Sequence, residues 1–159
     1  MSLLQSLQAK NRQPILTVDT ATDLMAITST FVVPAGLALN DVIEMGPIPN
    51  GYVLVDLSVA FPDCDSNGTP TIKFDAGVLS GNWLDSNGAG RTCGSEFFAA
   101  DVGAQTGSLT RMNKAAGMQI APTTNDRSWG LKVNVAAATL TTGATITGTI
   151  FVRPKIEGI

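Results

Sequence analysis

Apolar residues alternate with small or polar residues in four segments of the chain, and Gly, Pro, Asn and Asp residues separate these segments. Because successive side chains of a β-strand point to opposite faces of a sheet, a period of two predicts strands with one buried face. Almost no helical period lies between the segments, so the chain is predicted to be all-β. The positions expected to face the core are Val53, Val55, Leu57, Val59 and Phe61; Ile72, Phe74, Ala76 and Val78; Trp129, Leu131, Val133, Val135 and Ala137; and Ala144, Ile146, Gly148, Ile150 and Val152.

Weaker segments of similar composition complete the predicted fold. The expected strands cover residues 15–18, 24–33, 41–45, 52–61, 71–79, 118–121, 129–138 and 144–153. A short helix is expected over residues 96–102, with Ser95 as its N-cap. The stretches 80–94 and 103–117 are predicted to be loops. About eight strands with long excursions between the middle ones are typical of a jelly-roll-like antiparallel β-sandwich.

The N-terminus does not share this pattern. Leu3, Leu4 and Leu7 have the spacing of one or two amphipathic turns, and the basic residues Lys10 and Arg12 follow them. A helix this short is only marginally stable on its own. Two interpretations are open: a frayed terminus, or an arm that becomes ordered on a neighbouring subunit.

The length and charge of the chain bound its organisation and its partners. With 159 residues, we expect an N-terminal arm over residues 1–14 and a single β-sandwich domain over residues 15–159. Only 14% of the residues are charged, whereas about a quarter is usual for soluble domains. A partner often covers such uncharged surface, although Thr, Ser and Asn also keep a surface wet. The net charge of −3 argues against nucleic acid as a partner, and no apolar run approaches the roughly 18 residues of a membrane span.

The residue types needed for metal binding are scarce. The chain has no histidine, so a zinc site with about four ligands has too few candidates. Cys64 and Cys93 are favoured as two free thiols, and a disulfide between them stays open. Residues 63–68 begin like an EF-hand calcium loop, but its twelfth position, which needs a Glu, is Phe74. We therefore predict no metal and no cofactor, with a looser calcium site at residues 63–68 left open.

Catalytic chemistry is equally poorly supported. A Ser or Cys nucleophile would lack its usual histidine base, and no Gly-x-Ser-x-Gly motif is present. Asp56 and Asp75 have the opposite parity to the apolar residues of their strands, so we expect both to face solvent. We predict that the protein is not an enzyme.

Basic and aromatic side chains of the predicted loops are candidates for partner binding. Arg91, Arg111, Lys114 and Arg127 either gather into a patch that meets an acidic partner or remain scattered, solvated charges. Trp83 lies in a loop of Gly, Asn and Asp residues. It is suited to stack on a sugar, to anchor an interface or to fold back on its own domain.

Five blocks of sequence, in a fixed order, resemble a known family. They are residues 41–51 (DVIEMGPIPNG), 65–81 (DSNGTPTIKFDAGVLSG), 96–100 (EFFAA), 117–122 (GMQIAP) and 126–133 (DRSWGLKV). Through these blocks, residues 22–153 resemble the decoration, or cement, proteins of tailed-bacteriophage capsids. The resemblance implies a jelly roll or related β-sandwich on the outside of the phage head, often a trimer, that clamps neighbouring capsid subunits.

From this resemblance we expect a virion structural protein on the outer capsid surface, made in the host bacterial cytoplasm. Its expected partners are the major capsid protein and further copies of itself, most simply as a homotrimer. The residues expected to contact partners are Leu3, Leu4, Leu7, Lys10, Arg12, Trp83, Arg91, Arg111 and Arg127. Two alternatives are open: a carbohydrate- or receptor-binding module of a phage tail or fibre, with Trp83 as a sugar platform, and a glycosidase-like enzyme.

Overall fold

The computed structural model describes residues 3–10, 24–86 and 90–155 of the chain, so the strand predicted over residues 15–18 and the candidate Arg12 lie outside the described residues. The helical elements are short: α1 (Leu7–Lys10), η2 (Gly103–Gln105) and α2 (Ala115–Met118). The strands are β1 (Leu3–Gln5), β2 (Met25–Val32), β3 (Val42–Ile48), β4 (Tyr52–Phe61), β5 (Lys73–Val78), β6 (Phe98–Asp101), β7 (Ser108–Arg111), β8 (Arg127–Val135) and β9 (Thr145–Pro154).

The strands pair as one long hairpin that has been rolled up. β2 pairs with β9, β3 with β8, β4 with β7 and β5 with β6, all antiparallel. Rolling the hairpin adds the pairs β4–β9 and β5–β8, which complete two sheets. Their strand orders are β1-β3-β8-β5-β6 and β2-β9-β4-β7. This is the topology of a jelly roll, so the predicted fold class is confirmed.

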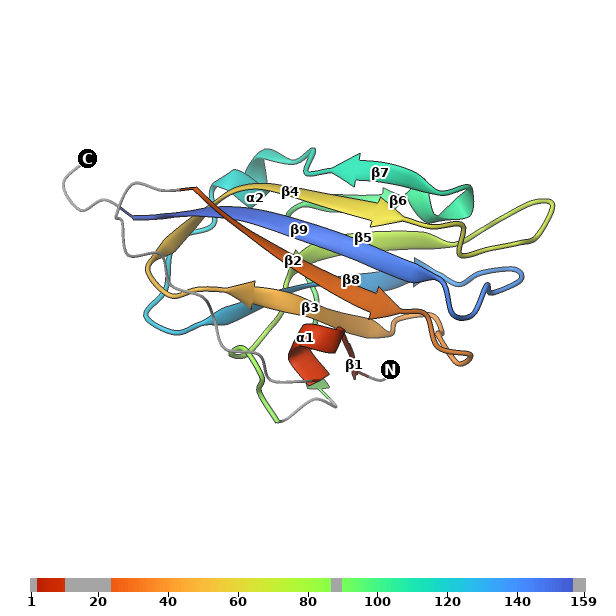
Figure 1. Cartoon of the computed structure of the whole chain (residues 1–159), viewed down its shortest axis with the longest axis horizontal. Coiled ribbons are helices and arrows are strands. Elements are labelled where there is room, and N and C mark those ends of the chain that lie inside the picture. The colour runs from red at the N-terminus through yellow and green to blue at the C-terminus, as the bar shows by residue number, and fades with distance from the viewer. Residues whose placement is uncertain (1–2, 11–23, 87–89, 156–159) are drawn as a thin grey trace.

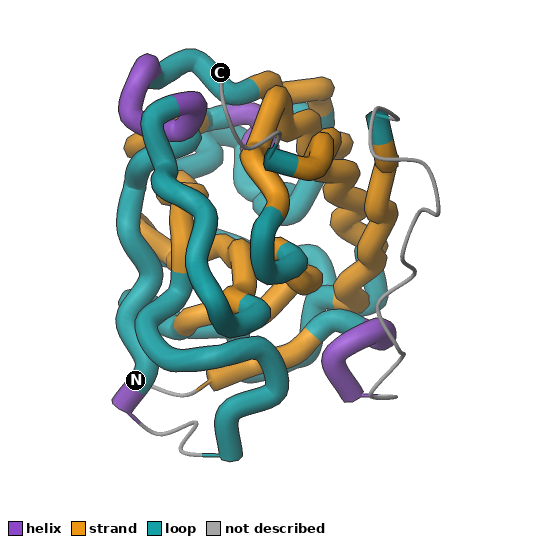
Figure 2. The backbone as a smooth tube through the Cα atoms, turned by 90° about the vertical axis from the view of Figure 1, so that its left-hand side faces the viewer, coloured by secondary structure: helices purple, strands orange, loops and turns teal. Residues whose placement is uncertain are grey.

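The two sheets form the layers of the sandwich. We call them the β3 sheet, which contains β1, β3, β8, β5 and β6, and the β9 sheet, which contains β2, β9, β4 and β7. β2, β9 and β4 run side by side in Figure 1. Figure 2 looks at one end of the sandwich, where loops and turns cross in front of the strands.

The alternation of apolar residues predicted most of the core correctly. Leu57, Val59 and Phe61 are buried, as are the predicted core residues in the middle of β5, β8 and β9. In β4, however, Leu54 is buried instead of Val53 and Val55. The register shifts between Leu54 and Asp56, which marks a β-bulge. A bulge inserts one residue into a strand and exchanges its two faces, so the period of two fails at that point.

Three predictions about the middle of the chain are wrong. Residues 98–101 form strand β6 instead of a helix, because Phe97 and Phe98 are both buried in the core and Phe98 pairs with Ala76 of β5. Residues 118–121 form no strand, because α2 continues to Met118 and Ile120 then packs against the core. The predicted loop over residues 103–117 contains η2, β7 and α2. In each case tertiary packing overrides a weak local pattern.

The N-terminal segment packs on its own domain. β1 runs parallel to β3, with Leu3 opposite Val42 and Leu4 opposite Ile43. Leu3 and Leu4 therefore lie in a strand and not in a helical turn, and the frayed-terminus interpretation is wrong for residues 3–10. The other interpretation, an arm that contacts a neighbouring subunit, stays a prediction.

Trp129 spans the space between the two sheets. Its indole ring extends from β8 toward β9, where a Cβ atom on Gly148 would lie 2.2 Å from the Cη2 atom of Trp129. Elsewhere in the core, the rings of Phe61 and Phe74 also meet across the sandwich, with centroids 5.3 Å apart. Glycine at position 148 is thus required by the close approach of a large buried ring.

We expect Gly148→Ala to destabilise the protein by about 1–3 kcal/mol, because the added methyl group overpacks a closely packed core. Urea unfolding measures the difference. Gly36→Ala is the matched control, since nothing lies within 4 Å of the added Cβ there, and it should change stability by less than about 0.5 kcal/mol. Equal stability of the two variants would contradict this account of Trp129.

Candidate interaction surface

A buried ion pair lies on the outer side of the β3 sheet. The carboxylate of Glu44, on β3, is fully buried, and its Oε1 atom lies 2.6 Å from Nη1 of Arg91. The Ser128 hydroxyl also donates to Glu44 Oε1, and the Gln5 amide donates to Oε2 at 2.9 Å. Arg91 is 4% exposed and also donates from Nε to the carbonyl of Ser80 at 2.7 Å. The pair therefore joins β1, β3, β8 and the long loop between β5 and β6.

This placement corrects the prediction for Arg91. We expected its guanidinium among the exposed basic residues of the loops, but it points inward and satisfies Glu44. The sequence held a signal for this ion pair, because Glu44 lies between the apolar residues Ile43 and Met45. In the structure, every residue of this strand is buried. A charged side chain in such a strand needs a buried partner of opposite charge.

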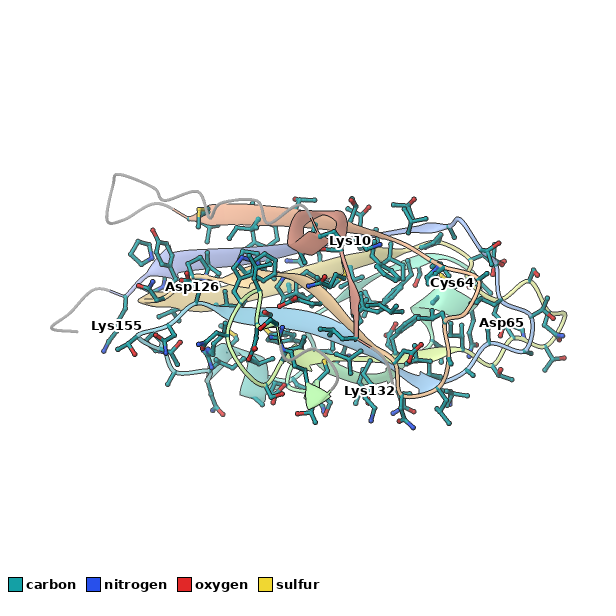
Figure 3. All side chains as sticks on the ribbon, turned by 90° about the horizontal axis from the view of Figure 1, so that it is seen from below. Lys10, Cys64, Asp65, Asp126, Lys132 and Lys155 are labelled. Carbon is teal, nitrogen blue, oxygen red and sulfur yellow. The ribbon has the colours of Figure 1, made fainter. Side chains whose placement is uncertain are left out.

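Asp65 organises one end of the sandwich, where Figure 3 labels it beside Cys64. Its buried carboxylate accepts hydrogen bonds from the backbone N–H groups of Asn67, Thr71, Ile72, Ala138 and Thr139 at 2.7–3.4 Å. Burial alone would raise the pKa of this carboxyl, but the N–H donors outweigh burial and hold the pKa well below its usual range.

The Asp65 arrangement does not fit a calcium ion. N–H groups converge on both carboxylate oxygens, so the positive ends of these dipoles occupy the places where a cation would bind. Across the described parts of the chain, no group of three or more His, Cys, Asp or Glu side chains is arranged to hold a metal ion.

Asp75 corrects a second prediction. We expected it to face solvent, but it is 8% exposed and accepts hydrogen bonds from the Ala100 N–H group at 2.7 Å and the Asn134 side chain at 2.9 Å. β5 lies inside its sheet, between β8 and β6, and the outer side of this strand is covered as well. Its parity therefore says which face Asp75 occupies but not whether that face is exposed.

The two cysteines are free thiols. Burial, together with the nearby Asp63 carboxylate, raises the pKa of Cys64 to about 11. Burial raises the pKa of Cys93 to about 12. Both thiols are protonated at neutral pH, and a thiol is a poor nucleophile compared with a thiolate.

The remaining partner-binding candidates do not form one patch. Lys10 is exposed at the end of α1, while Arg111 lies on β7 and pairs with Asp56 of β4. Trp83 is half-buried, and its backbone N–H group donates to the carbonyl of Asp126 at 2.9 Å, so Trp83 contacts the residue that precedes Arg127. Among the described candidates, Leu3, Leu4 and Lys10 share the N-terminal segment, and the fold brings Trp83 close to Arg127.

A groove of about 600 Å³ lies next to Arg127. One wall comes from the end of β5 and from Thr92–Glu96 of the following loop, and the other comes from residues 120–127. Sequence reasoning missed Glu96, whose carboxylate reaches into this region and accepts a hydrogen bond from the Val78 N–H group at 3.0 Å. The lining residues are Val78, Leu79, Ser80, Thr92, Cys93, Gly94, Glu96, Ile120, Ala121, Thr123 and Arg127.

The outer face of the β9 sheet carries few charges. Its register aligns Thr28 with Thr149 and Ser58, and their neighbours along the strands are mostly Thr, Ala and Val. The hydroxyls of Thr28 and Thr149 lie 2.9 Å apart. Asp56 and Arg111 pair with each other on this face. The uncharged outward positions are Ala26, Thr28, Thr30, Val32, Ser58, Ala60, Leu109, Thr145, Thr147, Thr149 and Phe151.

Comparison with solved structures identifies the class of protein. No family model matches the sequence, and no curated protein matches it either. A chain from the capsid of Ralstonia phage GP4, however, superposes with a TM-score of 0.91 and is 32% identical, over 98% of this chain and 100% of that chain. A chain from the capsid asymmetric unit of cyanophage Pam1 has a TM-score of 0.65 at 20% identity, over 90% of this chain and 96% of that chain, and shares the fold.

These are structural proteins of virus particles. The present chain belongs to the family of bacteriophage capsid proteins that includes the Ralstonia phage GP4 chain. It is therefore a structural component of a phage virion. In the described part of the chain, no helix has the length and apolar character needed to cross a membrane.

We expect Arg91→Met to destabilise the protein by about 3–5 kcal/mol, because it leaves the Glu44 carboxylate buried without a partner. The double variant Glu44→Gln/Arg91→Met should recover part of this loss, since the unpaired charge is then gone. Arg111→Met is the control: it also breaks an ion pair, but the Arg111 side chain is 64% exposed, so the change should stay below about 1 kcal/mol. Chemical unfolding measures the loss of stability in the three variants. Equal losses of stability for Arg91→Met and Arg111→Met would contradict the assignment of Glu44 and Arg91 as a buried ion pair that stabilises the fold.

We expect Asp65→Asn to lower stability by about 2–4 kcal/mol at pH 7, because several buried N–H groups lose a charged acceptor. The folded-state pKa of Asp65 lies below its unfolded-state value. Its stabilisation is therefore complete above about pH 4 and declines as the pH falls further. The difference in the free energy of unfolding between wild type and Asp65→Asn, measured by urea unfolding, should therefore become smaller between pH 4 and pH 2. Asp63→Asn changes an exposed neighbour and is the control, so it should lower stability at pH 7 by much less than Asp65→Asn does.

Proposed function

We propose that the protein is a capsid decoration, or cement, protein that binds the outside of the phage head and stabilises contacts between major capsid subunits. The observation that carries this proposal is the match to a phage capsid chain along essentially the whole length of both chains. All nine strands of the described residues belong to one jelly roll, whose interior is filled by side chains. A folded module of this kind is suited to bind a shell from outside.

The distribution of charge supports a role in subunit contacts. Glu44, Arg91, Asp65 and Asp75 are buried inside the domain. Separately, the outer face of the β9 sheet carries mostly uncharged residues. Contact through such a face removes few charges from water, so it avoids the large cost of desolvating unpaired ions. We propose that this face contributes to a homotrimer or to contact with the major capsid protein.

The proposal includes the N-terminal arm and excludes catalysis. Residues 3–10 lie along β3, with Lys10 exposed at the end of α1, and we propose that the residues up to 14 reach a neighbouring subunit. Both cysteines are held as thiols and the chain has no histidine, so we expect no turnover reaction. The capsid origin of the similar chains favours the head over a tail or fibre module.

The test is decoration of purified phage heads that lack this protein. We expect the added protein to sediment with the heads, to saturate at a fixed copy number, and to raise the temperature at which the heads disrupt. In solution it should have three times the 16.5 kDa mass of one chain. Absence of the protein from purified virions, or failure to bind heads at saturating concentration, would overturn the proposal.

A further inference from the structure

The groove beside Arg127 combines an apolar wall with a cation that has few partners. Arg127 lies at the start of β8 and is half-buried, and its Nη2 atom donates to the carbonyl of Ala121 at 2.8 Å. The Nε atom of Arg127 is buried and has no hydrogen-bond partner among the described residues. Within the same residues, Arg127 forms no ion pair. A guanidinium has five N–H donors, so most of its capacity is unused.

Arg127 is also unfavourably placed for a charge without a close counter-ion. Burial lowers its pKa, and the more distant Glu96 carboxylate opposes this effect only in part. Glu96 is itself engaged by the Val78 N–H group. A carboxylate brought into the groove would supply the missing counter-ion and accept charge-assisted hydrogen bonds.

A short antiparallel pair of strands builds one wall of the groove. Residues 92–94 pair with the end of β5: the Ser80 N–H group donates to Thr92 at 2.9 Å, and the Gly94 N–H group donates to Val78 at 3.1 Å. Cys93 lies between these bonds, opposite Leu79. In such an antiparallel pair the N–H and C=O groups of the middle residue point away from the partner strand. Cys93 therefore presents both backbone groups away from the end of β5 and away from β8, which lies on the other side of β5, so neither group points toward Arg127.

Apolar side chains form part of both walls of the groove. Val78, Leu79 and Ile120 line the groove together with the exposed Ala121. An open trough with an apolar wall and one localised cation that has unused donors suits a protein segment that presents a carboxylate beside apolar side chains. The Glu96 carboxylate in the same groove disfavours a polyanion such as nucleic acid.

We propose that this groove binds an acidic segment of a neighbouring capsid subunit, with an Asp or Glu side chain of that segment at Arg127 and its apolar side chains against Val78 and Ile120. This inference rests on the proposed function, because it names the contact through which the protein recognises its capsid partner. The groove lies toward the end of the molecule where Figure 3 labels Asp126 and Lys155, opposite the end with Asp65. The Lys155 N–H group bonds to Gly51, and Gly51 bonds to Thr123 of the groove wall.

Two charge-neutralising variants in the same groove test the proposal. Arg127→Gln should weaken binding to phage heads that lack the protein by about tenfold or more, because a charge-assisted contact is lost. Arg127→Lys, which keeps the charge, should recover part of the affinity. Glu96→Gln removes a charge of the opposite sign and keeps an oxygen for the Val78 N–H group, so its binding should be unchanged or tighter. Thermal unfolding must show that each variant is folded.

A photo-crosslinking amino acid at Thr92, an exposed residue of the groove wall, identifies the occupant. On illuminated heads, mass spectrometry should find it joined to a peptide of another capsid subunit that contains Asp or Glu. The groove proposal is overturned if wild-type protein decorates heads but Arg127→Gln binds equally well, or if Thr92 captures no such peptide. If wild-type protein itself does not bind heads, the proposed function fails instead.

Discussion

The ion pair between Glu44 and Arg91 is the constraint on which the arrangement of the β3 sheet depends. A carboxylate with no exposed surface is tolerable only when a cation and further donors surround it. Here the cation comes from the loop between β5 and β6, and the other donors come from Gln5 on β1 and Ser128 on β8. The loop and the N-terminal strand are therefore tied to the sheet through one carboxylate, and moving either one leaves it under-satisfied.

A charged side chain also lies at each end of the sandwich, and the two differ in how far the chain itself satisfies them. At one end, the Asp65 carboxylate gathers backbone N–H groups from three separate stretches of chain, which fixes the loops without a metal ion. At the other end, Arg127 keeps unused donors beside a groove. At the first end the chain itself satisfies the carboxylate, while at the second end Arg127 has hydrogen-bond donors available for a partner.

Placing bonded charges inside the domain suits a capsid component. Internal ion pairs and hydrogen bonds hold the jelly roll together, so its outer faces are able to carry few charges and to meet other subunits at low desolvation cost. Glu44, Arg91, Asp65 and Asp75 are among the charged residues that are used inside the domain.

The sequence by itself determined the class of fold and most of the core, because the period of two follows directly from strand geometry; β4 has the predicted bounds of 52–61. Three kinds of feature were decided only by tertiary structure. The bulge at residues 54–56 exchanged the faces of β4, pairing with β5 turned residues 98–101 into a strand, and burial converted Arg91 and Asp75 from expected surface charges into internal partners. The physical reason is common to all three: parity says which side of a strand a residue occupies, but only the packed neighbours decide whether that side meets water, another strand or a counter-ion.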